Sequence, residues 1–426
     1  MLGKFDAVIS RVHSILFLMT LASMLLGTAY AQTVMTQGAF LGDNGAIFIN
    51  GNLLYNNNSI YGVTYAGGEK DFGTVFQLSS STQLQTQNVL YSFSDSDGSR
   101  PNGSLIADAQ GNLYGTTNAG GAAGLGTIFK LTNPHAGNGS WVLTLLHSFT
   151  GPDGANPISG LTMGPGGVLY GTAANGGIVP CVGDSFLGGG APVFANGCGT
   201  VFTITASGAF HLLHVFNGHQ ADAGGPQTNV VVDPAGNVIG TTAYSTQPYG
   251  SGVVYKLTPS GVFSHVSDFY AKALLGYPIG NIVRDSAGNI YGTTEFSGGE
   301  NGPDGAGIFE ITAVTHEQLL LAQLLSQASR SGVVRDQAGN LYGTTIDGGA
   351  NHAGSVFRLD PMGRLTTVAS LGLSNLAPIG GVILDPAGNF WGTSSASFGQ
   401  GSGAAFCPTA ASVGVTGCGT VFSVTP

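Results

Sequence analysis

Charged side chains are scarce in this sequence. Only 8% of its 426 residues are charged, with 12 Lys and Arg against 22 Asp and Glu, and the formal net charge is −10. A protein that binds a polyanion needs a basic surface, so the composition argues against a nucleic-acid partner. Glycine, in contrast, is abundant at 71 residues.

Familiar catalytic motifs are missing as well. The sequence contains no Gly-x-Ser-x-Gly elbow, no His-Glu-x-x-His, no phosphate-binding loop and no convincing pair of carboxylates. The catalytic residues of any enzymatic activity are therefore unknown from the sequence.

What the sequence does contain is a repeat. The segment Leu-Tyr-Gly-Thr-Thr, with small variations, occurs seven times, and successive copies of its glycine lie 53, 56, 69, 52, 51 and 49 residues apart. A period of this length is typical of propellers and solenoids. The seven glycines are Gly62, Gly115, Gly171, Gly240, Gly292, Gly343 and Gly392.

Each repeat predicts four short strands, a to d. In the unit from Gly103 to Phe149 these are residues 104–107, 113–117, 126–131 and 143–149. Apolar residues alternate in strands c and d, which is the period of a β-strand. Seven equal units of four antiparallel strands favour a propeller over a sandwich. The predicted fold is all-β, a seven-bladed β-propeller of four-stranded antiparallel blades.

The connection between strands a and b has the form Asp-x-x-Gly-Asn. This pattern fits a type I turn closed by a left-handed Gly in a tight hairpin. A catalytic carboxylate at the Asp is the alternative, but the turn also accounts for the neighbouring residues. The copies lie at 108–112, 233–237, 285–289, 336–340 and 385–389.

Glycine inside strand b weakens a strand unless something needs the space. We therefore expect a neighbouring backbone or a strand c aromatic ring to pack over it. Two units depart from the pattern: Ile239 replaces an aromatic residue in unit four, and the Leu-rich segment 317–325 of unit five also fits a helix. Both are still predicted to be blades. The strand c aromatics are Phe76, Phe129, Phe202, Tyr255, Phe309, Phe357 and Phe422.

The ends of the chain predict how the ring closes. The last unit stops after Phe422 without a strand d, and residues 33–40 align as the missing fourth strand of blade seven. Residues 1–31 have the pattern of a secretory signal peptide, with an apolar run and the small residues Ala29-Tyr30-Ala31 before Gln32. We therefore expect a single propeller domain over 32–426, secreted and monomeric, without a membrane span in the mature chain.

The four cysteines form two local pairs, each in a loop between strands b and c. In an exported protein these pairs, Cys181 with Cys198 and Cys407 with Cys418, predict two loop-closing disulfides. A metal site is the alternative, but neither loop contains His and the spacing matches no zinc signature. We predict no metal centre.

In a propeller the b–c and d–a connections share one face, here called the loop face. Because this face carries the variable loops, we expect any ligand there. Asp95-Ser96-Asp97-Gly98-Ser99 partly resembles a calcium loop but lacks the later bidentate Glu, so a turn without a cofactor is favoured. The candidate ligand residues are Asp71, Asp95, Asp97, Asp153, His219 and Asp222.

His147 and His214 occupy equivalent positions in strand d, where blade one has Tyr91. A residue that follows the repeat in this way is expected to serve packing rather than to bind a ligand.

The combined pattern resembles a known family. Residues 103–131 and 149–157 carry Gly-x-Leu-x-x-Asp-x-x-Gly-Asn-Leu-Tyr-Gly-Thr-Thr, then Gly-Gly, Gly-Thr-x-Phe and Phe-x-Gly-x-Asp-Gly-x-x-Pro, with echoes in all seven units. They resemble the Gloeobacter-Verrucomicrobia ("GloVer") repeat of exported bacterial proteins. The resemblance implies export and a propeller fold, and it transfers no catalytic residue.

These observations predict a secreted binding or interaction module. The expected partners are glycans or cell-surface proteins, bound at the loop face. The alternative is an extracellular hydrolase or lyase acting on polysaccharide, whose carboxylates converge at the channel mouth from distant blades. A third possibility is a purely structural role in the cell envelope.

Overall fold

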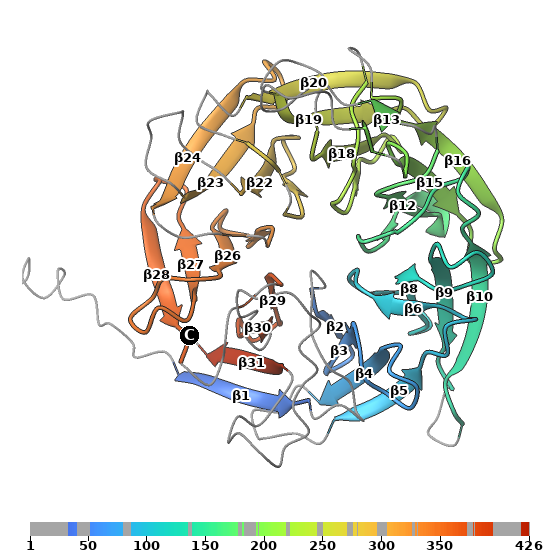
Figure 1. The fold of residues 1–426 in the computed structure, drawn as a ribbon. Coiled ribbons are helices and arrows are strands. Elements are labelled where there is room, and N and C mark those ends of the chain that lie inside the picture. Colours follow the sequence, from blue (N-terminus) through green and yellow to red (C-terminus); the bar gives the residue numbers. More distant parts are fainter. Residues whose placement is uncertain are drawn as a thin grey trace, which may run out of the picture.

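The computed structural model forms a closed ring of seven four-stranded antiparallel sheets (Figure 1). No α-helix occurs among the residues it describes. The predicted seven-bladed propeller is confirmed. The described residues are 33–40, 52–79, 87–134, 139–177, 181–182, 193–194, 196–218, 222–244, 250–270, 276–278, 280–295, 305–325, 329, 331–372, 378, 380–394 and 419–425.

The first four blades follow the chain, each from its inner strand a to its outer strand d. Their strands are β2 (Leu54–Asn56), β3 (Ser59–Thr64), β4 (Thr74–Ser79) and β5 (Asn88–Ser92); β7 (Ile106–Ala107), β8 (Leu113–Ala119), β9 (Thr127–Thr132) and β10 (Val142–Ser148); β11 (Thr162–Met163), β12 (Leu169–Ala173), β15 (Thr200–Ile204) and β16 (Phe210–Val215); and β17 (Val231–Val232), β18 (Val238–Thr242), β19 (Gly250–Leu257) and β20 (Phe263–Tyr270).

The last three blades complete the ring, and the strand from the N-terminal end belongs to the seventh. Their strands are β21 (Val283–Arg284), β22 (Ile290–Thr294), β23 (Gly305–Ile311) and β24 (Gln318–Leu325); β25 (Val334–Arg335), β26 (Leu341–Thr345), β27 (Ser355–Leu359) and β28 (Leu365–Ser370); and β29 (Val382–Leu384), β30 (Phe390–Ser394), β31 (Thr420–Thr425) and β1 (Thr33–Ala39).

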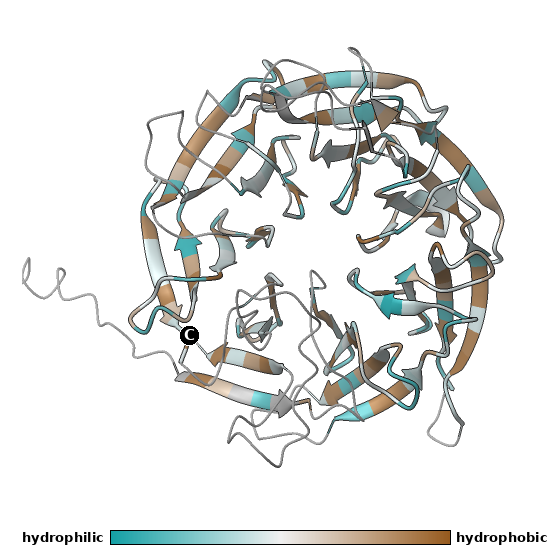
Figure 2. Cartoon of the chain, viewed as in Figure 1, coloured by the Kyte–Doolittle hydropathy of each residue, from teal (hydrophilic) through white to brown (hydrophobic). Residues whose placement is uncertain are grey.

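The two doubtful units are blades. The Leu-rich segment of unit five forms the outer strand β24, paired with β23, and unit four has all four of its strands. Hydrophobic segments lie mainly along the strands, as Figure 2 shows. One pairing was not predicted: β6 (Ser99–Pro101), in the connection from blade one, also pairs with β8. The remaining elements are β13 (Cys181–Val182), β14 (Val193–Phe194) and a 3-10 turn, η1 (Pro165–Gly167).

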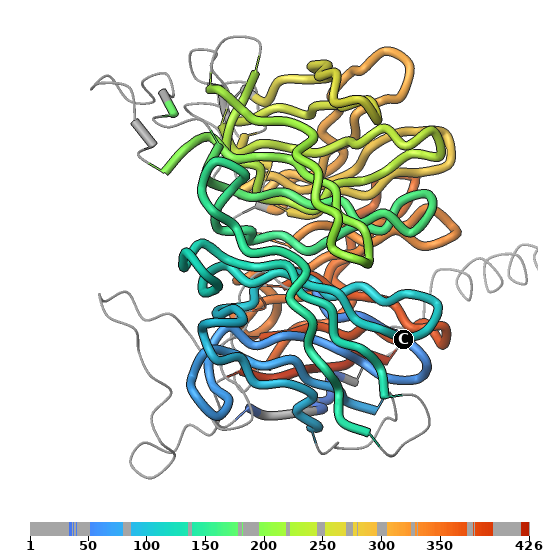
Figure 3. Tube along the Cα trace, turned by 90° about the vertical axis from the view of Figure 1, so that its right-hand side faces the viewer, coloured from blue at the N-terminus to red at the C-terminus, as the bar shows by residue number. Residues whose placement is uncertain are grey.

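The N-terminal strand closes the ring, as predicted. β1 pairs antiparallel with β31 from Thr33↔Thr425 to Ala39↔Thr420, and the blue and red ends of the chain lie together in both views (Figure 1, Figure 3). The Gln37 amide donates to Ser423 Oγ at 2.9 Å. Phe40 is fully buried and makes an edge contact with Phe76 of blade one. Strand β1 and Phe40, here called the clasp, therefore join blade seven to blade one. Strand β1 also covers the outer edge of β31.

Each strand b glycine lies under the aromatic ring of its strand c partner, which confirms the expected packing. Gly292, for example, pairs with Phe309, and a Cβ on Gly292 would lie 2.6 Å from Phe309 Cζ. The same holds for the other six pairs, and the seven rings are almost entirely buried. Even a methyl group at these positions has no room.

Threonines near the ends of the strands b link neighbouring blades around the channel. Thr293 Oγ1 of blade five donates to the carbonyl of Ser331 in blade six at 2.6 Å. Thr344 makes the equivalent bond to Gly380 at 3.0 Å. Thr116, Thr172 and Thr241 do the same in blades two to four. These hydroxyls satisfy buried carbonyls at the blade interfaces.

The a–b hairpins confirm the turn interpretation of their aspartates. Gly111 has a φ of 79°, and Asp108 accepts hydrogen bonds from the backbone and amide of Asn112 and from the Tyr114 hydroxyl. Burial raises the pKa of Asp108, but these hydrogen bonds outweigh it and leave the pKa below its ordinary value. The carboxylate is thus committed to holding the hairpin.

Candidate functional site

The d–a connections and the segments that follow strands b meet on the loop face. Ala155 is bridged to Asn175, and Gly224 is bridged to Tyr244 by two backbone hydrogen bonds. These bridges join the connection entering one blade to the end of a strand b, so the loop face is ordered by backbone contacts in this region.

A cavity of about 310 Å³ lies on this face between blades two, three and four. Its volume is at the lower end of the range of small-molecule sites. It is lined by Asn118, Asn156, Ile158, Ala174, Asn175, Cys181, Gly197, Cys198, Gly218, Gly224, Gly225, Gln227 and Tyr244.

Three asparagines form a connected row along one side of the cavity. The Asn156 amide donates to the carbonyl of Asn118 at 2.9 Å, and the Asn175 amide donates to Asn156 Oδ1 at 3.2 Å. Asn156 holds a positive φ of 52°, which Asn tolerates better than most residues. Amide side chains both donate and accept, so this row suits a ligand rich in hydroxyl or amide groups.

Tyr244 supplies an aromatic ring to the cavity. Its carbonyl accepts a hydrogen bond from Thr242 Oγ1 at 2.9 Å, and its ring packs over Gly225, where a Cβ would lie 2.7 Å from the ring. Gly225 has a φ of 67°, so both space and backbone conformation favour Gly there. Burial raises the pKa of Tyr244, and its phenol is neutral at physiological pH.

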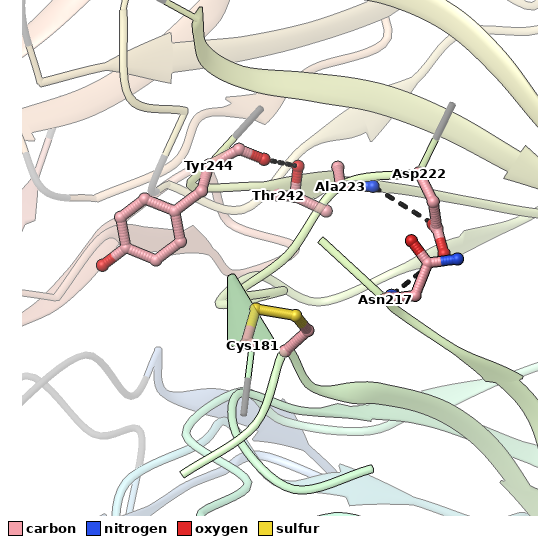
Figure 4. The surroundings of a disulfide bond; sticks show 7 residues. Cys181, Asn217, Asp222, Ala223, Thr242 and Tyr244 are labelled. Carbon is pink, nitrogen blue, oxygen red and sulfur yellow. Dashed lines mark hydrogen bonds between the residues drawn. A yellow bond between two sulfur atoms is a disulfide. The ribbon is translucent and has the colours of Figure 1, made fainter. Parts of the chain in front are cut away.

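The disulfide Cys181–Cys198 borders the cavity (Figure 4). Its Cα atoms are 4.9 Å apart and both cysteines are buried, so one of the two predicted disulfides is confirmed. Closing a loop of this length stabilises the folded state by roughly 3 kcal/mol. The other predicted pair, Cys407 with Cys418, lies outside the described residues.

Three of the predicted ligand carboxylates hold the d–a connections. Asp97 accepts from the Tyr91 hydroxyl at 2.6 Å, Asp153 lies 2.9 Å from His147 Nε2, and Asp222 lies 3.0 Å from His214 Nε2. Each also accepts a backbone N–H, including those of Ser94, Thr150 and Asn217. The repeating strand d position therefore serves the fold, as predicted for the histidines.

Electrostatics at one of these pairs supports the same conclusion. Burial raises the pKa of Asp153, but hydrogen bonds from Thr150 and His147 outweigh it, so the pKa lies below its ordinary value. The carboxylate is ionised at neutral pH, and its acceptor sites face Thr150 and His147.

The other predicted ligand residues do not meet in the cavity either. Asp71, at a φ of 62°, accepts the N–H of Gly67 at 2.7 Å, and Asp95, at a φ of 67°, exchanges two backbone hydrogen bonds with Gly98. His219 lies outside the described residues. None of the five described aspartates lines the cavity. Their role in ligand binding stays a prediction, and so does calcium at Asp95 and Asp97.

The residues that do line the cavity were missed because they belong to no motif. One signal was available: the residue before the proline of the d–a connection differs among the four connections that enter blades two to five. It is Arg100, Asn156, Gly225 and Tyr277 in successive connections, and all four have positive φ. A variable residue at a fixed, strained position of a repeat marks a place that the fold itself does not dictate.

Near the channel, the strand a ends form a ring of amides, hydroxyls and glycines. The N–H of Gly160 donates to Asn229 Oδ1 at 2.7 Å, and the N–H of Asn229 donates to Asn281 Oδ1 at 3.1 Å. The gap they enclose measures only about 20 Å³. Its described lining residues come from six blades and none is acidic or aromatic.

Two features are absent from the described residues. They contain no group of three or more His, Cys, Asp and Glu placed to hold a metal ion. They also contain no helix with the length and hydrophobicity needed to cross a membrane.

The fold and this cavity define the class: a seven-bladed β-propeller with a small, uncharged cavity on its loop face. The chain belongs to the Gloeobacter/Verrucomicrobia repeat family, whose model matches residues 13–180 and 183–406. The resemblance noted from the sequence is thereby confirmed. No match was found among curated protein sequences.

Solved propellers resemble the chain in fold. The extracellular domain of a putative hybrid two-component system from B. thetaiotaomicron is 11% identical with a TM-score of 0.51, over 85% of this chain and 38% of that chain. A putative 6-phosphogluconolactonase from Bacteroides uniformis is 14% identical with a TM-score of 0.49, over 79% and 89%. At such low identity the likeness concerns the fold alone.

Proposed function

We propose that the protein is an exported binding module whose loop-face cavity takes a neutral glycan. The observation that carries the proposal is the lining of the cavity. Asn118, Asn156, Asn175 and Gln227 provide amides, Tyr244 provides an aromatic ring, and no described lining residue is charged. Cell-surface polysaccharide is the natural source of such a ligand for a protein of an exported repeat family.

The chemistry of the lining fits a sugar better than an ion. Sugar hydroxyls both donate and accept, as the asparagine and glutamine amides do. The apolar face of a sugar ring can pack on the Tyr244 ring, while the rigid disulfide and the bridged backbone keep the cavity preformed. A preformed cavity lowers the entropic cost of binding.

The alternative, a hydrolase or lyase, needs two carboxylates around the substrate. The described aspartates of the loop face are instead bonded within their own connections, as Asp97 and Asp153 show. The proposal is therefore binding without turnover. An enzyme that uses other carboxylates is an outcome that the experiment distinguishes.

A panel of neutral and acidic glycans, tested for both binding and turnover, examines this proposal. We expect binding of one or more neutral glycans without product release. Tyr244→Ala should weaken it by about tenfold or more, since a central aromatic contact is worth about 1.4 kcal/mol or more.

Tyr65→Ala is the matched control, because Tyr65 also follows a strand b but does not line the cavity. It should leave glycan affinity unchanged. Binding that survives Tyr244→Ala, or that prefers acidic glycans, would contradict the assignment of the cavity. If the protein releases product, and replacing a single Asp or Glu abolishes that release, the hydrolase or lyase alternative is supported instead.

A further inference from the structure

In four blades the strand b aromatic residue has the same hydrogen-bond partner, on the face opposite the loop face. Its phenol hydroxyl, or the indole N–H of Trp391, donates to the aspartate of its own a–b hairpin in blades two, five, six and seven. The four bonds are Tyr114 to Asp108 at 2.9 Å, Tyr291 to Asp285 at 3.2 Å, Tyr342 to Asp336 at 3.0 Å and Trp391 Nε1 to Asp385 at 3.0 Å.

Cations also lie over this aromatic position. In blade two, Lys130 of the paired strand c lies 5.6 Å from the centre of the Tyr114 ring. Between blades five and six, Arg335 from the next strand a lies 5.7 Å from the centre of the Tyr291 ring. A cation over a ring face is attracted by the quadrupole of the ring.

At the corresponding place in blade four, a lysine, an arginine from the next blade and the hairpin aspartate are all present, but the aromatic ring is missing. Ile239 stands at the aromatic position, opposite Lys256 in the strand pairing, and Arg284 is the counterpart of Arg335 in the next blade. Both arginines fold back in the same way, Arg284 against Gly288 and Arg335 against Gly339.

The missing ring leaves a cavity of about 230 Å³ between blades four and five. Ile239, Val266, Ile290 and Ile311 provide apolar walls, and Asp233, Lys256 and Arg284 provide the charges. Asp233 Oδ2 accepts the Asn237 amide at 2.8 Å, as in the other hairpins, but has no phenol donor among the described residues. The cavity therefore offers apolar walls, two cations and a carboxylate oxygen at the place of an absent tyrosine.

We propose that this cavity binds a p-hydroxyphenyl group from outside the chain. The ring would occupy the position that Tyr114 and Tyr291 fill in their own blades, between the Lys256 and Arg284 side chains, and its hydroxyl would donate to Asp233. This site lies on the hairpin face, away from the glycan cavity, and does not depend on the proposed function.

The arrangement selects a phenol over other aromatic groups. A carboxylate accepts a hydrogen bond from the phenol hydroxyl, and this charge-assisted bond is lost when the oxygen carries a methyl group. An anionic ligand would be attracted by the two cations but repelled by the Asp233 carboxylate. A neutral phenol meets no like charge. Both a small phenol and an exposed tyrosyl side chain carry the required group.

Saturation-transfer NMR with p-cresol, on the chain without residues 1–31, tests the proposal. We expect transfer to the p-cresol ring, and affinity for p-methylanisole at least about tenfold lower because the hydrogen bond to Asp233 is lost. N-acetyl-L-tyrosinamide identifies the source: binding like p-cresol indicates a tyrosyl side chain, and its exclusion indicates a small phenol.

Ile239→Tyr should abolish the p-cresol signal, because the variant supplies its own ring, and should raise the melting temperature. Val262→Tyr is the matched control and should retain binding, because Val262 is exposed, belongs to the same blade and does not line the cavity. Should Ile239→Tyr fail to fold, Lys256→Gln and Arg284→Gln should each weaken binding several-fold. Absence of binding to the native chain, equal binding of p-methylanisole, or unchanged binding to folded Ile239→Tyr each overturns the proposal.

Discussion

Deleting residues 33–40 is expected to remove cooperative folding of the propeller. Without β1, the outer edge of β31 loses its partner along the whole ladder from Thr425 to Thr420. The buried contacts of Gln37 with Ser423 and of Phe40 with Phe76 are lost as well. An exposed edge with apolar surface around it promotes association between chains.

The expected loss is comparable with the whole stability of a folded domain, about 5 to 15 kcal/mol. The measurement is the thermal melt, together with size-exclusion chromatography, of the chains beginning at residue 33 and at residue 41. The longer chain should melt cooperatively as a monomer and the shorter should aggregate. Equal melting temperatures for the two would show that the ring does not need its clasp.

Gly292→Val is expected to lower the melting temperature by about 3 to 5 °C. The added Cβ would lie 2.6 Å from Phe309 Cζ and 3.1 Å from Ile282 Cγ2, inside a fully buried blade interface. Overpacking of this kind costs about 3 kcal/mol, which corresponds to a shift of about 3 to 5 °C for a domain of nearly 400 residues, because the unfolding entropy is about 2.1 cal/mol/K per residue. A thermal melt followed by circular dichroism measures it.

The double variant Gly292→Val, Phe309→Leu is the control for this prediction. Replacing the ring by a smaller side chain frees the space that the valine needs, so the double variant should melt closer to the native protein than the sum of the single effects predicts. Strictly additive effects, or an unchanged melting temperature for Gly292→Val alone, would show that the glycine serves no packing purpose.

The fold could be predicted because the features that build it recur along the chain, the strand b glycine seven times and the Asp-x-x-Gly-Asn turn five times. The Asp-x-x-Gly-Asn turn appears with the same hydrogen bonds at Asp108 and Asp336, and the strand b glycines all lie under a strand c ring. Repetition turns weak local signals into a strong one, because each unit repeats the same physical solution. For the same reason the Leu-rich segment 317–325, which also fits a helix, forms a strand paired with β23.

The proposed cavity could be predicted only as far as its face. The aspartates singled out from the sequence are polar and sit in loops, but Asp97, Asp153 and Asp222 are the capping groups of the d–a connections. The cavity residues come from three blades, and Asn118 meets Asn156 only after the ring has formed. Contacts of this kind depend on distances between blades in the folded protein, and the pattern of strands in the sequence does not predict these distances.

The blade-four cavity, in contrast, arises where one residue departs from the repeat. Ile239 departs from the repeat, while Asp233 keeps to it and Lys256 and Arg284 match Lys130 of blade two and Arg335 of blade six. A departure at one position with the surroundings retained is visible in the sequence, but its consequence, a cavity where a ring should be, is visible only in the structure.

The claim on which the account rests is that residue 33 and residue 425 are partners at the end of one antiparallel ladder. The most direct test is the double variant Thr33→Cys, Thr425→Cys, oxidised as a monomer at low protein concentration, with the linked peptides identified by mass spectrometry. Closure by the N-terminal strand predicts an intramolecular disulfide between these two positions in most molecules. Crosslinks formed only between chains, or none at all, would contradict a ring fastened by its own first strand.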